Sequence, residues 1–101
     1  MASVIRGTDI PFDLKNMPVG AEIKRLDFAQ NDNIILTKTA DDFSYDSQLN
    51  IYNATITQEE ALKFDGKKVV EVQLSFLLNG HIHKTHVKSF RADKTLYEGV
   101  I

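Results

Sequence analysis

The sequence predicts an all-β protein, an antiparallel β-sandwich of about seven strands, and three observations support that prediction. Apolar and polar residues alternate along several short segments, most clearly over residues 69–78 (VVEVQLSFLL), which puts one apolar row on one face of a sheet. Clusters of turn-forming residues separate these segments. Asn79-Gly80 joins two of them and is a strong hairpin signal, because both residues accept the positive φ of a type I′ turn.

The N-terminal part of the chain predicts two short strands followed by a loop. Residues 2–6 form a β-prone segment with Val4 and Ile5. Residues 8–14 alternate in the same way but contain Pro11, which lacks an N–H, so this segment is expected to be an edge strand or the start of a strand. Residues 15–20 (KNMPVG) are expected to form the loop.

Residues 21–39 predict a hairpin that turns at Asn31-Asp32-Asn33, since Asn and Asp tolerate the left-handed conformation. Leu26 and Phe28 are expected to face inward. Ile23 lies three residues before Leu26, and in a regular strand this odd spacing would put the two side chains on opposite faces. A β-bulge or a late strand start is therefore predicted.

The next segment, residues 40–48 (ADDFSYDSQ), is rich in turn formers, with Phe43 and Tyr45 as apolar anchors. Residues 49–56 predict a strand. Leu49 and Ile51 lie on one face of it, and the other face carries Tyr52, Ala54 and Ile56.

Residues 57–64 (TQEEALKF) interrupt the strand pattern and predict a short helix over residues 58–64. Thr57 and Glu60 have the spacing of a capping box, in which the hydroxyl accepts from the N3 amide and the carboxylate reaches back to the N-cap. Asp65-Gly66 ends the segment. We expect this helix to cross between two sheets.

The register of the Asn79-Gly80 hairpin is open at this level. A two-residue turn pairs Leu78 with His81 and Phe76 with His83, whereas a three-residue loop pairs Leu78 with Ile82. A last short strand is expected within residues 92–101.

These elements are best accommodated by an immunoglobulin-like sandwich, with a small closed barrel as the alternative. The length of 101 residues predicts a single domain, residues 1–101. The charge of -2 provides no basic face for nucleic acid or for an anionic membrane. The chain has no Cys for a disulfide or a zinc-thiolate site, and its N-terminus lacks the apolar core of a signal peptide.

The three histidines, His81, His83 and His86, fall within six residues and are the main candidates for chemistry. On a strand, His81 and His83 share a face about 7 Å apart and could ligate one metal ion. His86 would lie on the opposite face unless a bulge intervenes. Because no carboxylate is placed locally to complete a site, exposed polar strand residues are the better interpretation, and no metal or cofactor is predicted.

The carboxylates also favour structural interpretations. Asp41, Asp42 and Asp46 lack the spacing of a calcium loop, so a solvated acidic turn is expected. Capping explains the Glu59-Glu60 pair better than glycoside hydrolysis does. No nucleophile-elbow, phosphate-binding or dinucleotide motif occurs, so we expect no enzymatic activity.

From Leu26 onward the chain resembles a family of small phage proteins. The features that carry the resemblance are Phe28-Ala29-Gln30, the Ile35-Leu36-x-Lys38 strand, the TQEEALKF helix followed by the VEVQ strand, and the Gly-Val-Ile end. They are similar to the immunoglobulin-like N-terminal domain of the baseplate upper protein of siphophages that infect Gram-positive bacteria, and to short prophage relatives. The first 20 residues match less well.

The resemblance implies a virion structural protein, assembled in the host cytoplasm into a tail tip or baseplate through contacts with other virion proteins or with copies of itself. Exposed sheet edges would provide such contacts. Two alternatives belong to other classes. One is a carbohydrate-binding module for the host surface, although the chain has no Trp for a sugar platform. The other is a metal-binding protein or enzyme that uses His81 and His83.

Overall fold

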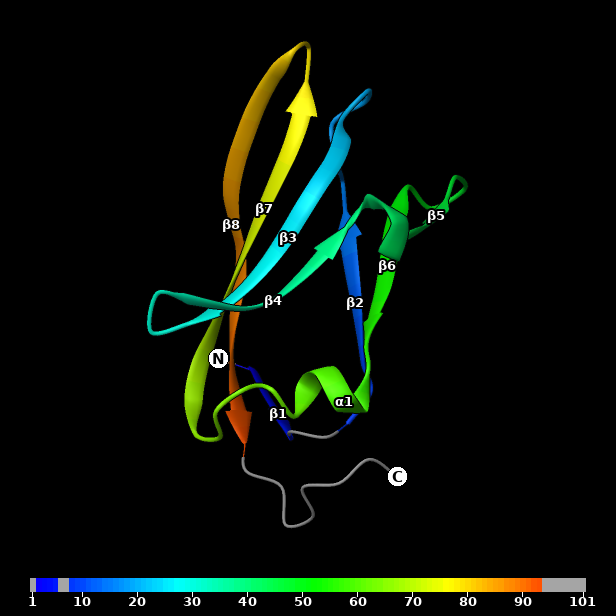
Figure 1. Cartoon of the computed structure of the whole chain (residues 1–101). Helices are drawn as coiled ribbons and strands as arrows, with labels where there is room; N and C mark the ends of the chain where they lie inside the picture. Colours follow the sequence, from blue (N-terminus) through cyan, green and yellow to red (C-terminus); the bar gives the residue numbers. More distant parts are fainter. Residues whose placement is uncertain (1, 6–7, 94–101) are drawn as a thin grey trace.

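The computed structural model describes residues 2–5 and 8–93, which form two β-sheets that pack face to face (Figure 1). The larger sheet has five strands, in the order β1 (Ala2–Ile5), β8 (His81–Asp93), β7 (Lys68–Leu78), β3 (Glu22–Gln30) and β4 (Asn33–Thr39). The smaller sheet has three, in the order β2 (Ile10–Lys15), β6 (Ile51–Ile56) and β5 (Ser44–Asp46). All neighbours are antiparallel except β1, which runs parallel to β8.

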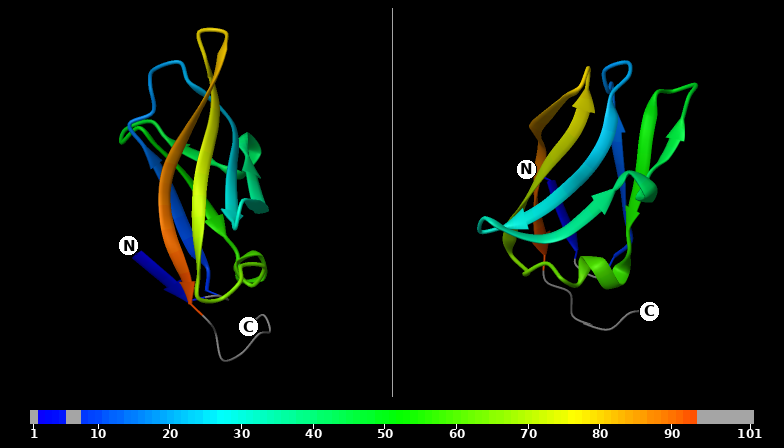
Figure 2. Two further views of the ribbon diagram at one scale, coloured as in Figure 1. Left: turned by 90° about the vertical axis from the view of Figure 1, so that its left-hand side faces the viewer. Right: turned by 45° about the horizontal axis from the view of Figure 1, so that its top comes forward.

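The strand order is that of an immunoglobulin-type sandwich. The run β8-β7-β3-β4 corresponds to strands G-F-C-C′ of that fold, and β2-β6-β5 corresponds to B-E-D. The predicted all-β sandwich is therefore confirmed, and the alternative of a closed barrel is wrong because no hydrogen-bonded strand pair joins the two sheets within the described residues. Figure 2 gives two further views, and in the right-hand view β8, β7 and β3 lie on one side and β2 and β6 on the other.

Several predicted boundaries need correction. The helix covers only Gln58–Ala61 (α1) instead of residues 58–64, because the chain tightens after Ala61 into turns whose hydrogen bonds span three residues, such as Phe64 N–H to Ala61 C=O. The described strands number eight, since Ser44–Asp46 pairs with β6 inside the segment expected to be a turn. Leu49 belongs to the turn before β6 and is 67% exposed.

Other predictions are confirmed by the backbone. β2, which contains Pro11, is an edge strand. The register between β3 and β7 shifts between Ile23 and Arg25, which is the expected bulge, and it leaves Ile23 buried beside Leu26. The predicted last strand lies mostly outside the described residues; β8 ends at Asp93.

The hairpin at Asn79-Gly80 has the two-residue turn, with φ of 53° and 78° at its two residues. Leu78 therefore pairs with His81, and Phe76 pairs with His83. A second register shift, between Val72 and Gln73, leaves Val87 as an extra residue on β8. The alternative of a three-residue loop is thus wrong.

Four phenylalanines form a continuous aromatic column through the core. Phe12 on β2 meets Phe28 on β3 edge to face, with ring centroids 5.5 Å apart. Phe28 also contacts Phe64, which follows α1, at 6.3 Å, and Phe64 contacts Phe90 on β8 at 6.1 Å. All four rings are at most 2% exposed. In a chain without Cys or Trp, this column takes the place of the disulfide and tryptophan of antibody domains.

Two polar contacts tie the segment around α1 to the larger sheet. Lys38 on β4 is 7% exposed, and its Nζ donates to both carboxylate oxygens of Glu60 at 2.7 and 2.9 Å. Glu60 also accepts from the Thr57 N–H, which completes the predicted capping box. The buried Gln30 amide pairs with the backbone of Asp65 in both directions, at 2.7 and 2.9 Å. The rim of the sandwich beside β4 is therefore closed by hydrogen bonds.

The acid sensitivity of the fold should depend on Glu60. Burial acts to raise the pKa of the Glu60 carboxyl, but hydrogen bonds from Lys38 and Thr57 and the charge of Lys38 outweigh burial and lower that pKa below its ordinary value of 4.5. A lowered folded-state pKa means that the carboxylate stabilises the fold above about pH 4.5, and that this stabilisation is lost as the pH falls through the folded-state pKa.

We therefore expect Glu60→Gln to lower the free energy of unfolding by about 1.5 to 3 kcal/mol at neutral pH, through loss of a charge-assisted hydrogen bond. The variant should also lose less stability than the unmodified protein between about pH 6 and about pH 3. Urea unfolding followed by circular dichroism measures both effects. Glu59→Gln, on the same turn but exposed, is the control. Equal acid sensitivity of Glu60→Gln and the unmodified protein would contradict the assignment.

Candidate interaction surface

The outer surface of β4, β3, β7 and β8 carries three hollows, and we call it the open face. The smaller sheet packs against the inner side of these strands, so the outer side carries the alternate residues of each strand. The open face consists of Arg25, Asp27, Ala29, Ile34, Thr37, Val69, Glu71, Gln73, Ser75, Leu77, Ile82, Lys84, His86, Ser89 and Arg91.

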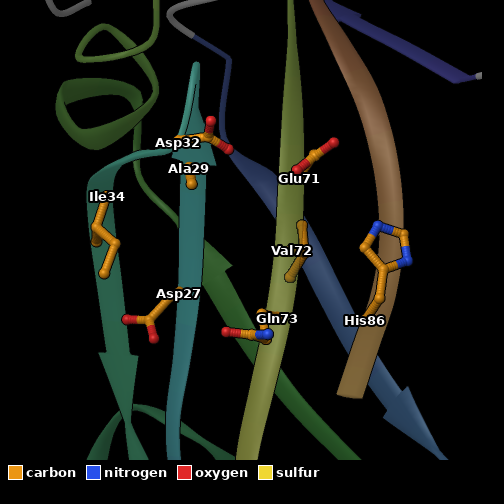
Figure 3. Close-up of a pocket in the computed structure, with 8 residues that line it drawn as sticks. All are labelled: Asp27, Ala29, Asp32, Ile34, Glu71, Val72, Gln73 and His86. Carbon is orange, nitrogen blue, oxygen red and sulfur yellow. The ribbon is translucent and has the colours of Figure 1, made fainter. Parts of the chain in front are cut away.

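Three adjoining hollows mark the open face, with volumes of about 340, 300 and 400 Å³. The first is shown in Figure 3, where Glu71, Gln73 and His86 project from β7 and β8 beside Asp27 and Ala29 of β3. The second lies around the β3–β4 turn. The third shares Asp27, Ile34 and Gln73 with the first and is otherwise lined by Lys24, Arg25, Ser75, Ile82 and Lys84. One end of the open face is therefore rich in cations, and the other contains carboxylates.

A hydrogen-bonded cluster fixes the middle of the face. Asp27 is 8% exposed and accepts from Arg25 Nε at 2.9 Å, from the Arg25 guanidinium terminus at 2.8 Å and from Thr37 Oγ1 at 2.7 Å. The hydrogen bond to Asp27, and then its charge, raises the pKa of Arg25. The negative charge of Asp27 is thus balanced by Arg25, and its oxygens accept hydrogen bonds from Arg25 and Thr37. Asp27 therefore has a structural role and is not available to bind another molecule.

Beside this cluster lie polar groups with no such partners. Ser75 is 5% exposed, and its hydroxyl makes no hydrogen bond to another described residue. Glu71 and Lys84 are exposed, and neither forms an ion pair within residues 8–93. A buried hydroxyl without a partner is costly, so the floor of the third hollow is suited to an incoming hydrogen-bonding group.

Aliphatic side chains surround these polar groups. Ile34 is 57% exposed, Val69 38% and Ile82 56%, and these are three of the six exposed large hydrophobic residues of the described structure. They lie on three different strands and line the hollows of the open face, Ile34 the first and the third, Val69 the second and Ile82 the third.

The histidines do not come together. His81 and His83 project from the same face of the hairpin and are exposed, and the His83 ring stacks on Phe76 with centroids 5.2 Å apart. His86 lies on the opposite side, in the open face, where its Nε2 is 3.0 Å from Ser89 Oγ. No group of three or more His, Asp or Glu side chains that could hold a metal ion occurs among the described residues.

The acidic turn residues serve local backbone contacts. Asp42 accepts from the Thr39 N–H at 2.8 Å, and Asp46 accepts from the N–H groups of Gln48 and Leu49. These contacts agree with the solvated-turn interpretation of the sequence.

A separate small pocket of about 190 Å³ lies at the rim where η1 (Ala40–Asp42) meets β3 and β6. Phe43, Tyr45 and Tyr52 line it together with Ala21 and Glu22. Tyr45 is 52% exposed, and the centroid of its ring lies 4.5 Å from the centroid of the Tyr52 ring. The expected anchoring role thus applies to Phe43, which packs against the core, while Tyr45 presents an aromatic surface to solvent.

The sequence alone did not reveal every feature of the open face or of the pocket beside Tyr45 and Tyr52. Strand alternation shows that Glu71, Gln73 and Ser75 point away from the core, but it does not show that Ser75 is buried between longer neighbours. The Tyr45–Tyr52 contact depends on the pairing of β5 with β6, and β5 is too short to be found from periodicity.

No protein-family model matches the chain, and no match to it was found among curated proteins. Within the described residues, no helix has the length and apolar character needed to cross a membrane.

Proposed function

We propose that the protein is a non-enzymatic structural protein of a phage virion, which acts in the tail tip or baseplate as an assembly module through protein–protein contacts. Its partners are other virion proteins and copies of itself; neither nucleic acid nor a membrane is proposed as a partner. Placement in a phage particle rests on the sequence resemblance that runs from Phe28-Ala29-Gln30 through TQEEALKF to the Gly-Val-Ile end.

One observation carries the contact role, namely the open face with its hollows and its exposed Ile34, Val69 and Ile82. A four-stranded sheet surface with aliphatic groups among unpaired polar ones has the composition of a protein interface. The side chains that could suggest catalysis are engaged in structure, since Glu60 caps α1 and Asp27 binds Arg25.

The proposal predicts that the protein is a stoichiometric component of virus particles. Particles released from the bacterium that carries the gene would be purified on a density gradient, and their proteins quantified by mass spectrometry. The expected result is a fixed ratio of this protein to the major tail proteins across the particle peak, while an abundant host protein serves as the control for contamination. Its absence from particles, together with its presence in the lysate, would contradict the proposal.

A carbohydrate-binding role is the second candidate, and the Tyr45–Tyr52 pair favours it. The exposed ring of Tyr45, supported by the partly buried Tyr52, offers a flat apolar surface for the face of a sugar ring, and Glu22 at the pocket could accept hydrogen bonds from hydroxyl groups.

If this second role holds, Tyr45→Ala should weaken binding to cell-wall polysaccharide of the host at least tenfold, whereas Tyr45→Phe should retain most of the binding because the ring remains. A glycan array followed by titration calorimetry provides the measurement. Since Tyr45 is half exposed, both variants are expected to fold. A folded, unmodified protein that binds no glycan on the array would exclude this candidate.

A further inference from the structure

We propose that the open face binds the same face of a second copy of this chain about a two-fold axis, with Glu71 of each copy seated in the third hollow of the other. The inference deepens the proposed assembly role and depends on it for its biological meaning, but its physical argument comes from the residues of the face alone.

Rows of outward-facing residues cross β7 and β8. Outward-facing partners in register are Val69 and Arg91, Glu71 and Ser89, Gln73 and His86, Ser75 and Lys84, and Leu77 and Ile82. Successive rows are about 7 Å apart. The row of Gln73 and His86 is the middle one, so two rows lie on each side of it.

The proposed two-fold axis lies between the two facing sheets, perpendicular to the strands and above the middle row. Rotation about this axis places each row of one copy over the row of the second copy that is equally far from the middle row but on its opposite side. Such an isologous contact requires the face to be complementary to itself under that exchange. The row of Glu71 then lies over the partner's row of Ser75 and Lys84. The row of Val69 lies over the partner's row of Leu77 and Ile82.

The first of these exchanges matches charges. On β3, Arg25 is in register with Ser75, so Ser75 has Arg25 on one side and Lys84 on the other. A carboxylate arriving over Ser75 would therefore meet Lys84 and the buried Ser75 hydroxyl that has no partner among the described residues, next to Arg25, which is paired with Asp27. Glu71 is an exposed carboxylate without an ion pair in that part of the chain, and the axis delivers it to this position.

The reciprocal contact is equally favourable. Lys84 of the partner arrives at the row of Glu71, next to the first hollow, which is lined by Asp27, Asp32 and Glu71. Because the contact between Glu71 of one copy and Lys84 of the other occurs twice in a symmetric pair, two cation–carboxylate contacts form. Each of them joins groups that have no ion pair in the described part of a single copy.

The second exchange matches apolar surface. Val69 is 38% exposed and Ile82 56% exposed, and the axis places Val69 of one copy near Leu77 and Ile82 of the other. These apolar contacts would cover the outer side of each charged contact, next to the exposed Arg91 in the row of Val69.

The size of the face sets the expected strength. Four strands about 4.8 Å apart and five rows about 7 Å apart give a footprint on the order of 500 Å². That value is below the roughly 800 Å² per partner of a standard interface. We therefore expect a reversible dimer with a dissociation constant in the micromolar range.

The test uses charge reversal at the two positions, with the full chain studied by sedimentation velocity over a wide concentration range. Glu71→Lys and Lys84→Glu should each shift dimerisation to at least tenfold higher concentration, since like charges then face each other twice. Mixing the two variants should restore dimers, because each of the two contacts in a mixed pair again joins a lysine to a glutamate. The double variant Glu71→Lys/Lys84→Glu should dimerise with itself.

A matched control comes from the outer surface of the smaller sheet, where Asp13 and Lys15 are exposed on β2. Asp13→Lys and Lys15→Glu should leave dimerisation within twofold of the unmodified protein. Circular dichroism verifies that every variant is folded.

Several results would overturn the inference. One is a monomer up to millimolar concentration, and another is an association that the single reversals leave unchanged. Failure of the mixture to form dimers, or growth beyond dimers, would also count against it. These outcomes differ from failure of the proposed function, which is absence of the protein from virus particles.

Discussion

The contact of Phe28 with its aromatic neighbours is the interaction on which the rest of this structure depends. Phe28 sits on β3, a strand with hydrogen-bonded neighbours on both sides, and its ring reaches Phe12 of the opposite sheet and Phe64 of the segment after α1. Through Phe64 the same column reaches Phe90 on β8. Both layers and the crossover between them are thereby joined by one run of rings, which a small domain without a disulfide needs.

Polar contacts around this column satisfy the inner side and the rim of the larger sheet. Lys38 and Gln30 point inward from the larger sheet, and Glu60 and Asp65 satisfy them from the α1 segment. An inward-pointing lysine on β4 also protects that edge against uncontrolled strand addition. On the outer side of the sheet, Glu71, Ser75 and Lys84 have side chains without a hydrogen bond or ion pair to another described residue, and these are the groups that the proposed contact with a second copy would use.

Sequence reasoning worked where a single physical rule determined the outcome. Alternation placed Phe28 and Leu26 in the core, the parity break at Ile23 marked a real bulge, and Thr57 with Glu60 capped a helix. It was less accurate where short-range patterns compete, as at the end of α1 and at β5, whose three residues are held by pairing with β6. Alternation also placed His86 on the face opposite His81, but the depth of Ser75 arises from neighbouring strands, so the hollows of the open face could be found only from the structure.

A double-mutant cycle between Phe12 and Phe28 tests the central role of the aromatic column most directly. The free energy of unfolding would be measured by urea titration for the unmodified protein, Phe12→Leu, Phe28→Leu and the double variant. An edge-to-face contact at 5.5 Å across the two sheets predicts a coupling energy of about 0.5 to 1.5 kcal/mol. Additive losses, with a coupling near zero, would contradict the account and would mean that the two sheets are held together by general burial alone.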